Sequence, residues 1–282
     1  MLDAPMWDMS LAYLGVVALF SAAWFVARKR ERTTAVIVLE SGAFALAAIY
    51  LTLVLYRHLF ELDVAGPYWQ LSLMATVWLL SAATQFYRIK AEGPLKPSRT
   101  ALGAIFGAVG LAFLAGAGAT NPLLTGDVAG PPVFDTLLVA YGLPALVLAV
   151  VAWRFAHLDR RLRIGVGAIA GLAAAAYVGL EIRRLWQGPV LSAPGVADGE
   201  QYSYTITLLL LGSGLLIAAL RSGRATLRKI ALAVIGLAIA KVFLIDMSGL
   251  TGLIRVFSFL ALGLSLVALT WLNRWMTERY QS

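Results

Sequence analysis

The segment Lys229–Arg274, KIALAVIGLAIAKVFLIDMSGLTGLIRVFSFLALGLSLVALTWLNR, consists of two apolar runs joined by a short turn. The first run contains one lysine, Lys241, the turn begins at Asp246, and the second run contains Arg255 near its start. A charged side chain inside such a run costs a few kcal/mol on membrane-insertion scales, so it needs a partner or a function. All three charges lie near the same end of this hairpin. The segment therefore predicts one polar cluster at one membrane face.

The composition of the whole chain is that of a membrane protein. Hydrophobic residues make up 60% of the sequence and charged residues 13%, whereas a soluble domain has about 25% charged residues. The formal net charge is +8, but the basic residues occur in short clusters between apolar runs, which argues against a nucleic-acid partner. The chain has no cysteine and two histidines, so we expect no disulfide, metal site or other cofactor.

Nine apolar runs come close to the ~20 residues that a bilayer-spanning helix needs. They are residues 9–27, 34–56, 68–87, 100–119, 134–155, 164–182, 202–220, 227–245 and 250–272. The predicted fold is an all-α, polytopic transmembrane helix bundle of about nine helices. Two sets of glycines favour close approach of neighbouring helices: Gly103, Gly107 and Gly110, and Gly165, Gly167 and Gly171.

Basic residues alternate sharply between the loops that join these runs. One set of loops holds most of the 23 Lys and Arg residues. The other set, with its helix ends, holds only Arg57, Arg183, Arg184, Lys241 and Arg255. By the positive-inside rule, the N-terminus lies outside and the C-terminus lies in the cytoplasm.

Part of the sequence favours an internal repeat. The stretch Leu11-Ala-Tyr-Leu-Gly parallels Val139-Ala-Tyr-Gly-Leu-Pro at the opening of another helix. We expect one transmembrane domain, residues 1–282, with four-helix repeat units at 33–155 and 163–274. The helix 9–27 would then end an earlier unit. Four is even, so the copies would be parallel, and the chain would follow further transmembrane helices. The alternative is that Ala-, Leu- and Gly-rich helices resemble one another by chance.

Several motifs together resemble one bacterial family. They are Lys241-Val-Phe-Leu-Ile-Asp246, Gly252-Leu-Ile-Arg255, Asn121-Pro-Leu-Leu, Ala140-Tyr-Gly-Leu-Pro144 and Leu180-Glu-Ile-Arg183. They resemble the C-terminal part of the predicted membrane proteins known as domain of unknown function 2339, well over residues 100–282 and loosely before. Members of that family are usually longer, with more helices. The resemblance implies a multi-pass protein of the bacterial inner (cytoplasmic) membrane and brings no known reaction with it.

The charged residues at the predicted outer face have two interpretations. They are Lys241, Asp246, Arg255, Arg57, Glu181, Arg183 and Arg184. In the first, the long cations extend to the interface and Asp246 caps the turn. In the second, they form a cationic pocket that binds the phosphate or carboxylate headgroup of an anionic lipid or lipid-linked glycan. Lys241 and Asp246 are about 140° apart around an α-helix, so the spacing predicts no direct pair.

Two glutamates have alternatives of their own. Glu181 is interpreted either as an intrahelical ion-pair partner of the following arginines or as a general base. Glu40 is the only carboxylate well inside an apolar run. It is interpreted as a member of a proton relay, or as a protonated acid hydrogen-bonded to the neighbouring helix through Thr84 or Gln85.

Two functional classes follow. The favoured class is a non-enzymatic protein that binds, moves or scaffolds an anionic envelope lipid or lipid-linked glycan. The alternative is a membrane-embedded transferase or hydrolase that uses Asp246, Glu181 or His58 on a lipid-linked substrate. No two acid–base candidates share a helix face at catalytic spacing, which argues against the second class.

Overall fold

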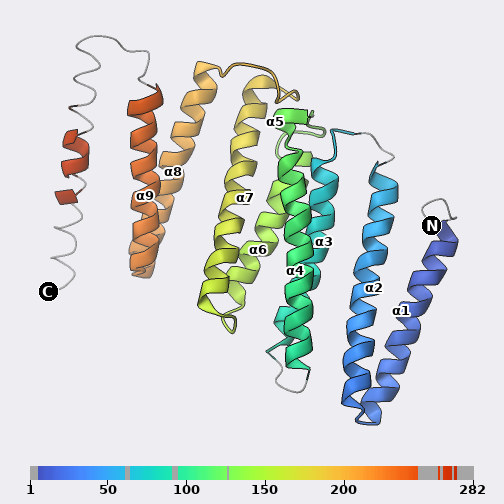
Figure 1. Cartoon of the computed structure of the whole chain (residues 1–282). Helices are drawn as coiled ribbons and strands as arrows, with labels where there is room; N and C mark the ends of the chain where they lie inside the picture. The colour runs from blue at the N-terminus through green and yellow to red at the C-terminus, as the bar shows by residue number, and fades with distance from the viewer. Residues whose placement is uncertain are drawn as a thin grey trace. The chain divides into compact units, whose positions relative to one another are not determined.

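The computed structural model describes residues 6–60, 64–90, 95–125 and 127–246, with short helical stretches at 260, 263–268 and 270–271. The described chain is all-α, as predicted, and its first eight apolar runs each contain a helix (Figure 1). Most of the ninth run, 250–272, lies outside the described residues. The chain divides into two compact units, Met1–Pro194 and Gly195–Ser282.

The first unit is built from helix pairs joined by short connections. Its elements are α1 (Met6–Lys29), α2 (Thr33–Phe60), α3 (Tyr68–Arg88), α4 (Lys96–Ala119), α5 (Pro122–Thr125), the π-helical turn η1 (Leu138–Gly142), α6 (Leu143–Arg154) and α7 (Arg160–Gln187). Helix α1 packs along α2, α3 along α4, and α6 along α7. In the second unit, α8 (Asp198–Ser222) packs along α9 (Ala225–Lys241), which continues into a second π-helical turn, η2 (Val242–Asp246).

Five of the described helices are long and apolar enough to cross a membrane. They cover Trp7–Lys29, Thr33–Leu59, Lys96–Leu124, Arg160–Gln187 and Asp198–Ser222. A shorter apolar helix spans Leu138–Arg154. These helices support a multi-pass arrangement, because a bilayer core requires about 20 apolar residues per crossing helix.

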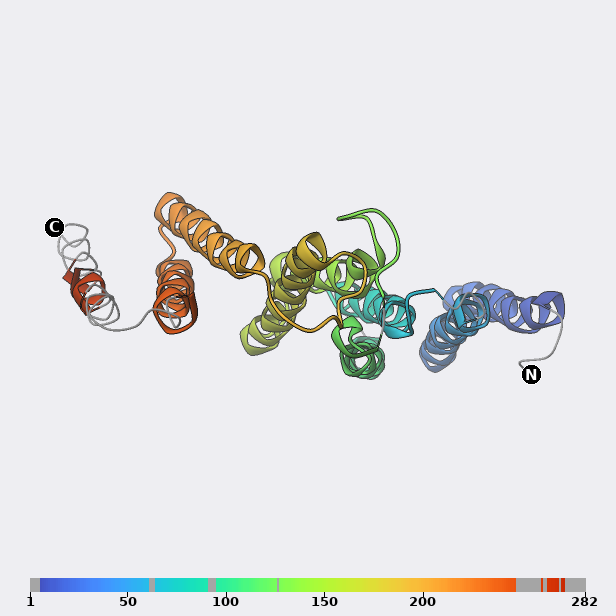
Figure 2. The same ribbon diagram turned by 90° about the horizontal axis from the view of Figure 1, so that it is seen from above.

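Helix α3 is not one of these five helices, and it contacts α2, α4, η1 and α6 (Figure 2). Its polar side chains bond to those neighbours. The indole Nε1 of Trp78 donates to Thr52 Oγ1 of α2 at 2.9 Å, and Gln70 Nε2 donates to the carbonyl of Leu59 at 2.6 Å. The hydroxyls of Tyr68 and Thr136 lie 2.5 Å apart. Because lipid offers no hydrogen-bond partners, these polar groups fix α3 inside the unit.

A proline explains the π-helical turn η1 beside α3. Pro144 has no N–H, so the carbonyl of Ala140, four residues earlier, lacks its α-helical donor. The backbone instead widens, and the N–H of Leu143 donates to the carbonyl of Leu138. The Ser72 hydroxyl of α3 donates a short hydrogen bond to the Ala140 carbonyl. One side chain of α3 therefore satisfies the acceptor that the proline leaves open.

The glycine predictions have different outcomes. Gly103 and Gly110 of α4 lie directly against α3, and a Cβ at Gly110 would lie 3.1 Å from the backbone nitrogen of Leu79. In α7, by contrast, a Cβ added at Gly165 or Gly171 would have no atom of another described residue within 4 Å. The predicted close approach is confirmed for the α4 set and wrong for most of the α7 set.

The predicted four-helix repeat stays a prediction. The boundary between the compact units follows Pro194, which lies inside the second predicted repeat unit, 163–274. The boundary between compact units is defined by contacts between residues, whereas a repeat is defined by the similarity of two segments. The position of the boundary therefore does not test the repeat.

Replacing Gly110 by valine is expected to lower the stability of the first unit. The new side chain would meet the α3 backbone at Leu79, and overpacking of this kind costs roughly 1–3 kcal/mol. Thermal unfolding of the detergent-solubilised protein would measure the change, with Gly118→Val as the control, because a Cβ at Gly118 meets no described atom within 4 Å. Equal midpoints for the two variants would contradict the close α3–α4 contact.

Candidate functional site

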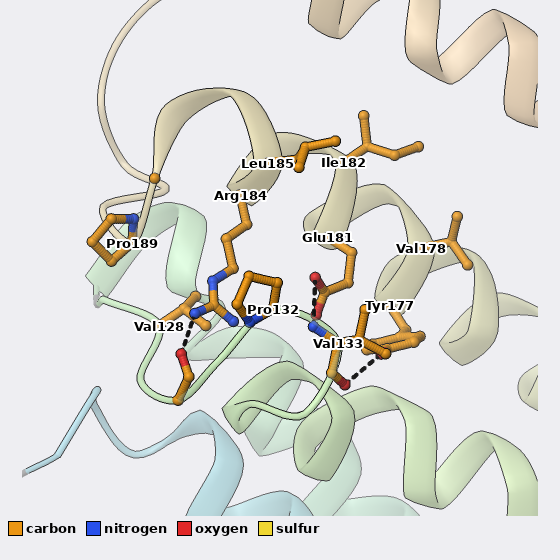
Figure 3. A pocket seen from close by; sticks show the side chains of 12 residues that line it. Val128, Pro132, Val133, Tyr177, Val178, Glu181, Ile182, Arg184, Leu185 and Pro189 are labelled. Atoms are coloured by element: carbon orange, nitrogen blue, oxygen red, sulfur yellow. Dashed lines mark hydrogen bonds between the residues drawn. The ribbon is translucent and has the colours of Figure 1, made fainter.

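One cavity of the first unit lies between α7 and the loop that precedes η1. Its volume is about 680 Å³. Its wall is mostly apolar, with contributions from Val128, Pro132, Val133, Val178, Ile182, Leu185 and Pro189. Figure 3 shows Arg184, Glu181 and Tyr177 extending from α7 toward the loop at Pro132 and Val133. Apolar cavities with a few convergent polar groups are typical ligand sites.

The side chain of Arg184 links this loop to α7 through an ion pair and hydrogen bonds. Its guanidinium forms a close ion pair with Asp135 and donates to the carbonyls of Gly130 at 2.5 Å and Pro131 at 3.4 Å. The Arg184 side chain is 9% exposed and that of Asp135 is fully buried. Sequence reasoning missed Asp135, although an aspartate before an apolar run is a helix N-cap signal. Its Oδ1 indeed accepts from the N–H groups of Leu137 and Leu138 at 2.8 and 3.0 Å.

Glu181 is only partly satisfied. Its Oε2 accepts from the N–H of Val133 at 3.4 Å, while its Oε1 is buried with no hydrogen-bond partner among the described residues. The Tyr177 hydroxyl donates to the carbonyl of Val133 at 2.8 Å. The expected intrahelical ion pair between Glu181 and Arg184 is wrong. Arg184 forms its ion pair with Asp135, which comes from a different segment.

Two further predicted site residues do not line this cavity. Arg183 donates from Nε to the carbonyl of Leu191 and from Nη2 to that of Ala193, both at 2.7 Å, so it holds the loop after α7. Arg57 lies in the last turn of α2 and is half-buried. Of the predicted arginines in the first unit, the cavity includes Arg184 alone.

The second unit contains a compact polar cluster around Lys241. The ammonium group lies 2.6 Å from Asp246 Oδ1 and donates to Thr205 Oγ1 at 2.7 Å and to the carbonyl of Gln201 at 2.9 Å. Asp246 also accepts from Thr205 Oγ1 at 2.6 Å and from Gln201 Nε2 at 3.0 Å. The cluster ties the end of α9 to the first turns of α8.

The expectation that Lys241 and Asp246 do not pair is therefore wrong. It assumed α-helical geometry, in which residues five apart face different directions. The segment between them is π-helical, and a π-helix bonds residue i to residue i+5, which brings the two side chains together. Arg255, the predicted third member, lies outside the described residues. One pocket that combines this cluster with Glu181 and Arg184 stays a prediction.

Glu40 of α2 forms the third buried charge cluster. Its side chain is 6% exposed and lies 3.0 Å from both Arg88 Nη1 and Arg99 Nε. The indole Nε1 of Trp24 on α1 donates to Glu40 Oε2 at 3.2 Å. Both arginines lie at helix ends beside a basic loop, and no spacing along the sequence predicts a buried partner for them. The chain brings them to Glu40 because both flank the α3–α4 connection, beside the first turns of α2.

The alternative partners expected for Glu40 are wrong. The Thr84 hydroxyl donates to the carbonyl of Leu80 in its own helix at 2.9 Å. Gln85 is fully buried, and neither side-chain amide atom has a partner among the described residues. The proton-relay role of Glu40 stays a hypothesis.

Replacing Glu40 by alanine is expected to destabilise the first unit by about 3 kcal/mol, because it leaves two arginines without their buried counter-ion. Thermal or denaturant unfolding in detergent would measure the loss, with Asp8→Ala, an exposed carboxylate in α1, as the control. Similar stabilities for the two variants would contradict a buried triad.

A double-mutant cycle tests the second-unit cluster. We expect Lys241→Ala and Asp246→Ala to be non-additive, with a coupling free energy of roughly 0.5–3 kcal/mol, because each removes the same ion pair. Thr270→Ala combined with Lys241→Ala is the control pair, since the Thr270 hydroxyl bonds to Leu266 within its own helix. Additive effects in the Lys241–Asp246 cycle would contradict the pairing across the π-helical turn.

Comparison with known proteins gives one family. No curated protein and no solved structure matches the chain. The family described as "Predicted membrane protein (DUF2339)" matches residues 2–275, including the first hundred residues, where the sequence resemblance was loose. This match and the five long apolar helices agree on a multi-pass membrane protein. The chain belongs to the DUF2339 family of predicted membrane proteins.

Proposed function

We propose that the chain binds a lipid-linked glycan or an anionic envelope lipid, without catalysis, in order to move or scaffold it. The proposed location is the bacterial inner membrane, with the N-terminus outside and the C-terminus in the cytoplasm. The observation that carries the proposal is the cavity of about 680 Å³, whose apolar wall contains Glu181 and Arg184.

The chemistry of the cavity favours a glycan-bearing lipid over a simple acidic lipid. Arg184 is paired with Asp135, so the cavity does not offer an uncompensated cation. Glu181 Oε1, in contrast, is a buried acceptor that lacks a donor among the described residues. Sugar hydroxyls supply such donors, and the apolar wall suits the lipid part.

The orientation supports a substrate in the outer leaflet. The cavity lies at the C-terminal end of α7, which the charge pattern of the loops assigns to the outer face. Arg57, Arg183 and Arg255 are assigned to the same face, and we propose that these cations add to the attraction for an anionic headgroup. Lys241 and Asp246, also assigned to this face, neutralise each other.

The enzymatic alternative has less support. A glycosyl hydrolase or transferase uses two carboxyl groups, one as acid and one as base or nucleophile. Asp135 is the carboxyl group that interacts with Glu181, but its oxygens already accept from Arg184 and from two backbone N–H groups. Asp246 is likewise occupied by Lys241, Thr205 and Gln201.

The test is native mass spectrometry of detergent-purified Glu181→Leu beside wild type. We expect wild type to retain a sugar- or phosphate-bearing lipid, and the variant to retain it up to roughly tenfold less, because one hydrogen bond contributes about 0.5–1.5 kcal/mol. The unfolding temperature should change little, since the substitution removes an unsatisfied buried acceptor together with a long 3.4 Å hydrogen bond from the N–H of Val133, an exposed residue.

The control is Glu31→Leu, which removes the same charge from the α1–α2 connection. Equal retention by wild type and Glu181→Leu would overturn the assignment of the cavity. A wild-type protein free of any such lipid after mild extraction would overturn the proposed ligand class.

A further inference from the structure

A second cavity lies at the other end of the first unit, beside the α3–α4 connection. Its volume is about 540 Å³. Four of the residues that line it are cations: Arg28, Arg88, Lys90 and Arg99. Trp24 and Tyr87 also line the wall, and none of the described residues that line it is acidic. Concave clusters of arginine and lysine are suited to phosphate, which accepts several charge-assisted hydrogen bonds.

The charges around this cavity do not cancel. Glu40 lies behind the wall and pairs with Arg88 and Arg99. Arg28 and Lys90 have no acidic partner among the described residues, and the Arg28 guanidinium lies 5.1 Å from the centre of the Trp24 ring. Among the described residues, these four cations therefore have one paired carboxylate, Glu40. An excess of positive charge in such surroundings favours a bound counter-anion.

An apolar groove of about 450 Å³ adjoins this cavity and shares Trp24 and Arg88 with it. Its wall includes Phe25, Leu39, Ala43 and Phe44, from α1 and α2. The carboxylate of Glu40 also lines it and is already paired with Arg88 and Arg99. The two hydroxyls in the wall already donate to carbonyls of their own helices, at Val17 and Leu80, so they need no partner from a ligand. A groove of this kind matches a hydrocarbon chain.

We propose that the two cavities together bind one anionic glycerophospholipid. Its phosphate lies among Arg28, Arg88, Lys90 and Arg99, and one acyl chain lies in the groove beside Phe44. Glu40 holds Arg88 and Arg99 at the cavity wall, so part of the binding surface is organised before the lipid arrives. This site is separate from the α7 cavity, differs in ligand, and does not depend on the function proposed above.

The test compares the double variant Arg28→Gln/Lys90→Gln with wild type. These two cations do not pair with Glu40, so the triad remains. The detergent-purified proteins are titrated with phosphatidylglycerol, phosphatidylcholine or inorganic phosphate, and bound molecules are counted by native mass spectrometry. The matched control is Arg160→Gln/Arg161→Gln, which removes two exposed cations at the start of α7.

We expect wild type and the control to bind one phosphatidylglycerol in preference to phosphatidylcholine. The double variant should bind phosphatidylglycerol roughly tenfold more weakly, because each juxtamembrane cation adds appreciably to the attraction for anionic lipid. Equal phosphatidylglycerol affinities for wild type and double variant would overturn the proposal. Equal affinity for the two lipids would also overturn it. Displacement of the lipid by an equal concentration of inorganic phosphate would mean that the site binds a free anion, and would overturn the proposed lipid.

Ala43→Phe provides a second readout that leaves every charge in place. The larger side chain fills the groove where the acyl chain is placed, so we expect weaker phosphatidylglycerol binding with unchanged phosphate binding. Undiminished lipid binding by this variant would mean that no chain occupies the groove, and would overturn that part of the proposal.

Discussion

Polar groups within an apolar helix bundle must find their hydrogen-bond partners in the protein, and this constraint determines the arrangement of the first unit. Helix α3 shows it most clearly, since its buried face bonds to α2 on one side and to the turn before α6 on the other. The hydrogen bond from Ser72 to the Ala140 carbonyl is the most specific of these contacts. It places a hydroxyl where a proline has removed a backbone donor, so the sequences of two distant helices are matched to each other.

The buried charges obey the same constraint. Glu40 pairs with Arg99, Asp135 with Arg184, and Lys241 with Asp246, and each ion pair has at least one partner less than a tenth exposed. The first two pairs join segments 59 and 49 residues apart, so they also fix tertiary structure. Glu181 Oε1 departs from this pattern. Among the described residues the buried amide of Gln85 departs from it as well. An unsatisfied buried acceptor is costly, and for Glu181, at a cavity wall, we propose a ligand as the missing donor.

The sequence predicted the helices well because a crossing helix needs a long apolar run, and that property is local. The position of Glu181 and Arg184 near the C-terminal end of α7 also followed from local order. The partners were harder to predict, since Glu40 meets Arg99 through the packing of α2 against the α3–α4 pair, which no spacing along the chain encodes. The prediction that Lys241 and Asp246 do not pair was wrong for another reason. The estimate of about 140° between them holds for an α-helix, whereas the backbone there is π-helical.

The π-helical turn η2 can be viewed as an α-helix that carries one extra residue. Removing one residue from Val242–Ile245 would let the segment return to ordinary α-helical winding and would leave Lys241 four positions from the aspartate, a spacing at which α-helical side chains face each other. The ion pair would then survive a change of chain length that alters the helix type. A relative with a Lys-x-x-x-Asp spacing would therefore keep the same ion pair at this point, although a residue-by-residue comparison would score it as differing by a gap.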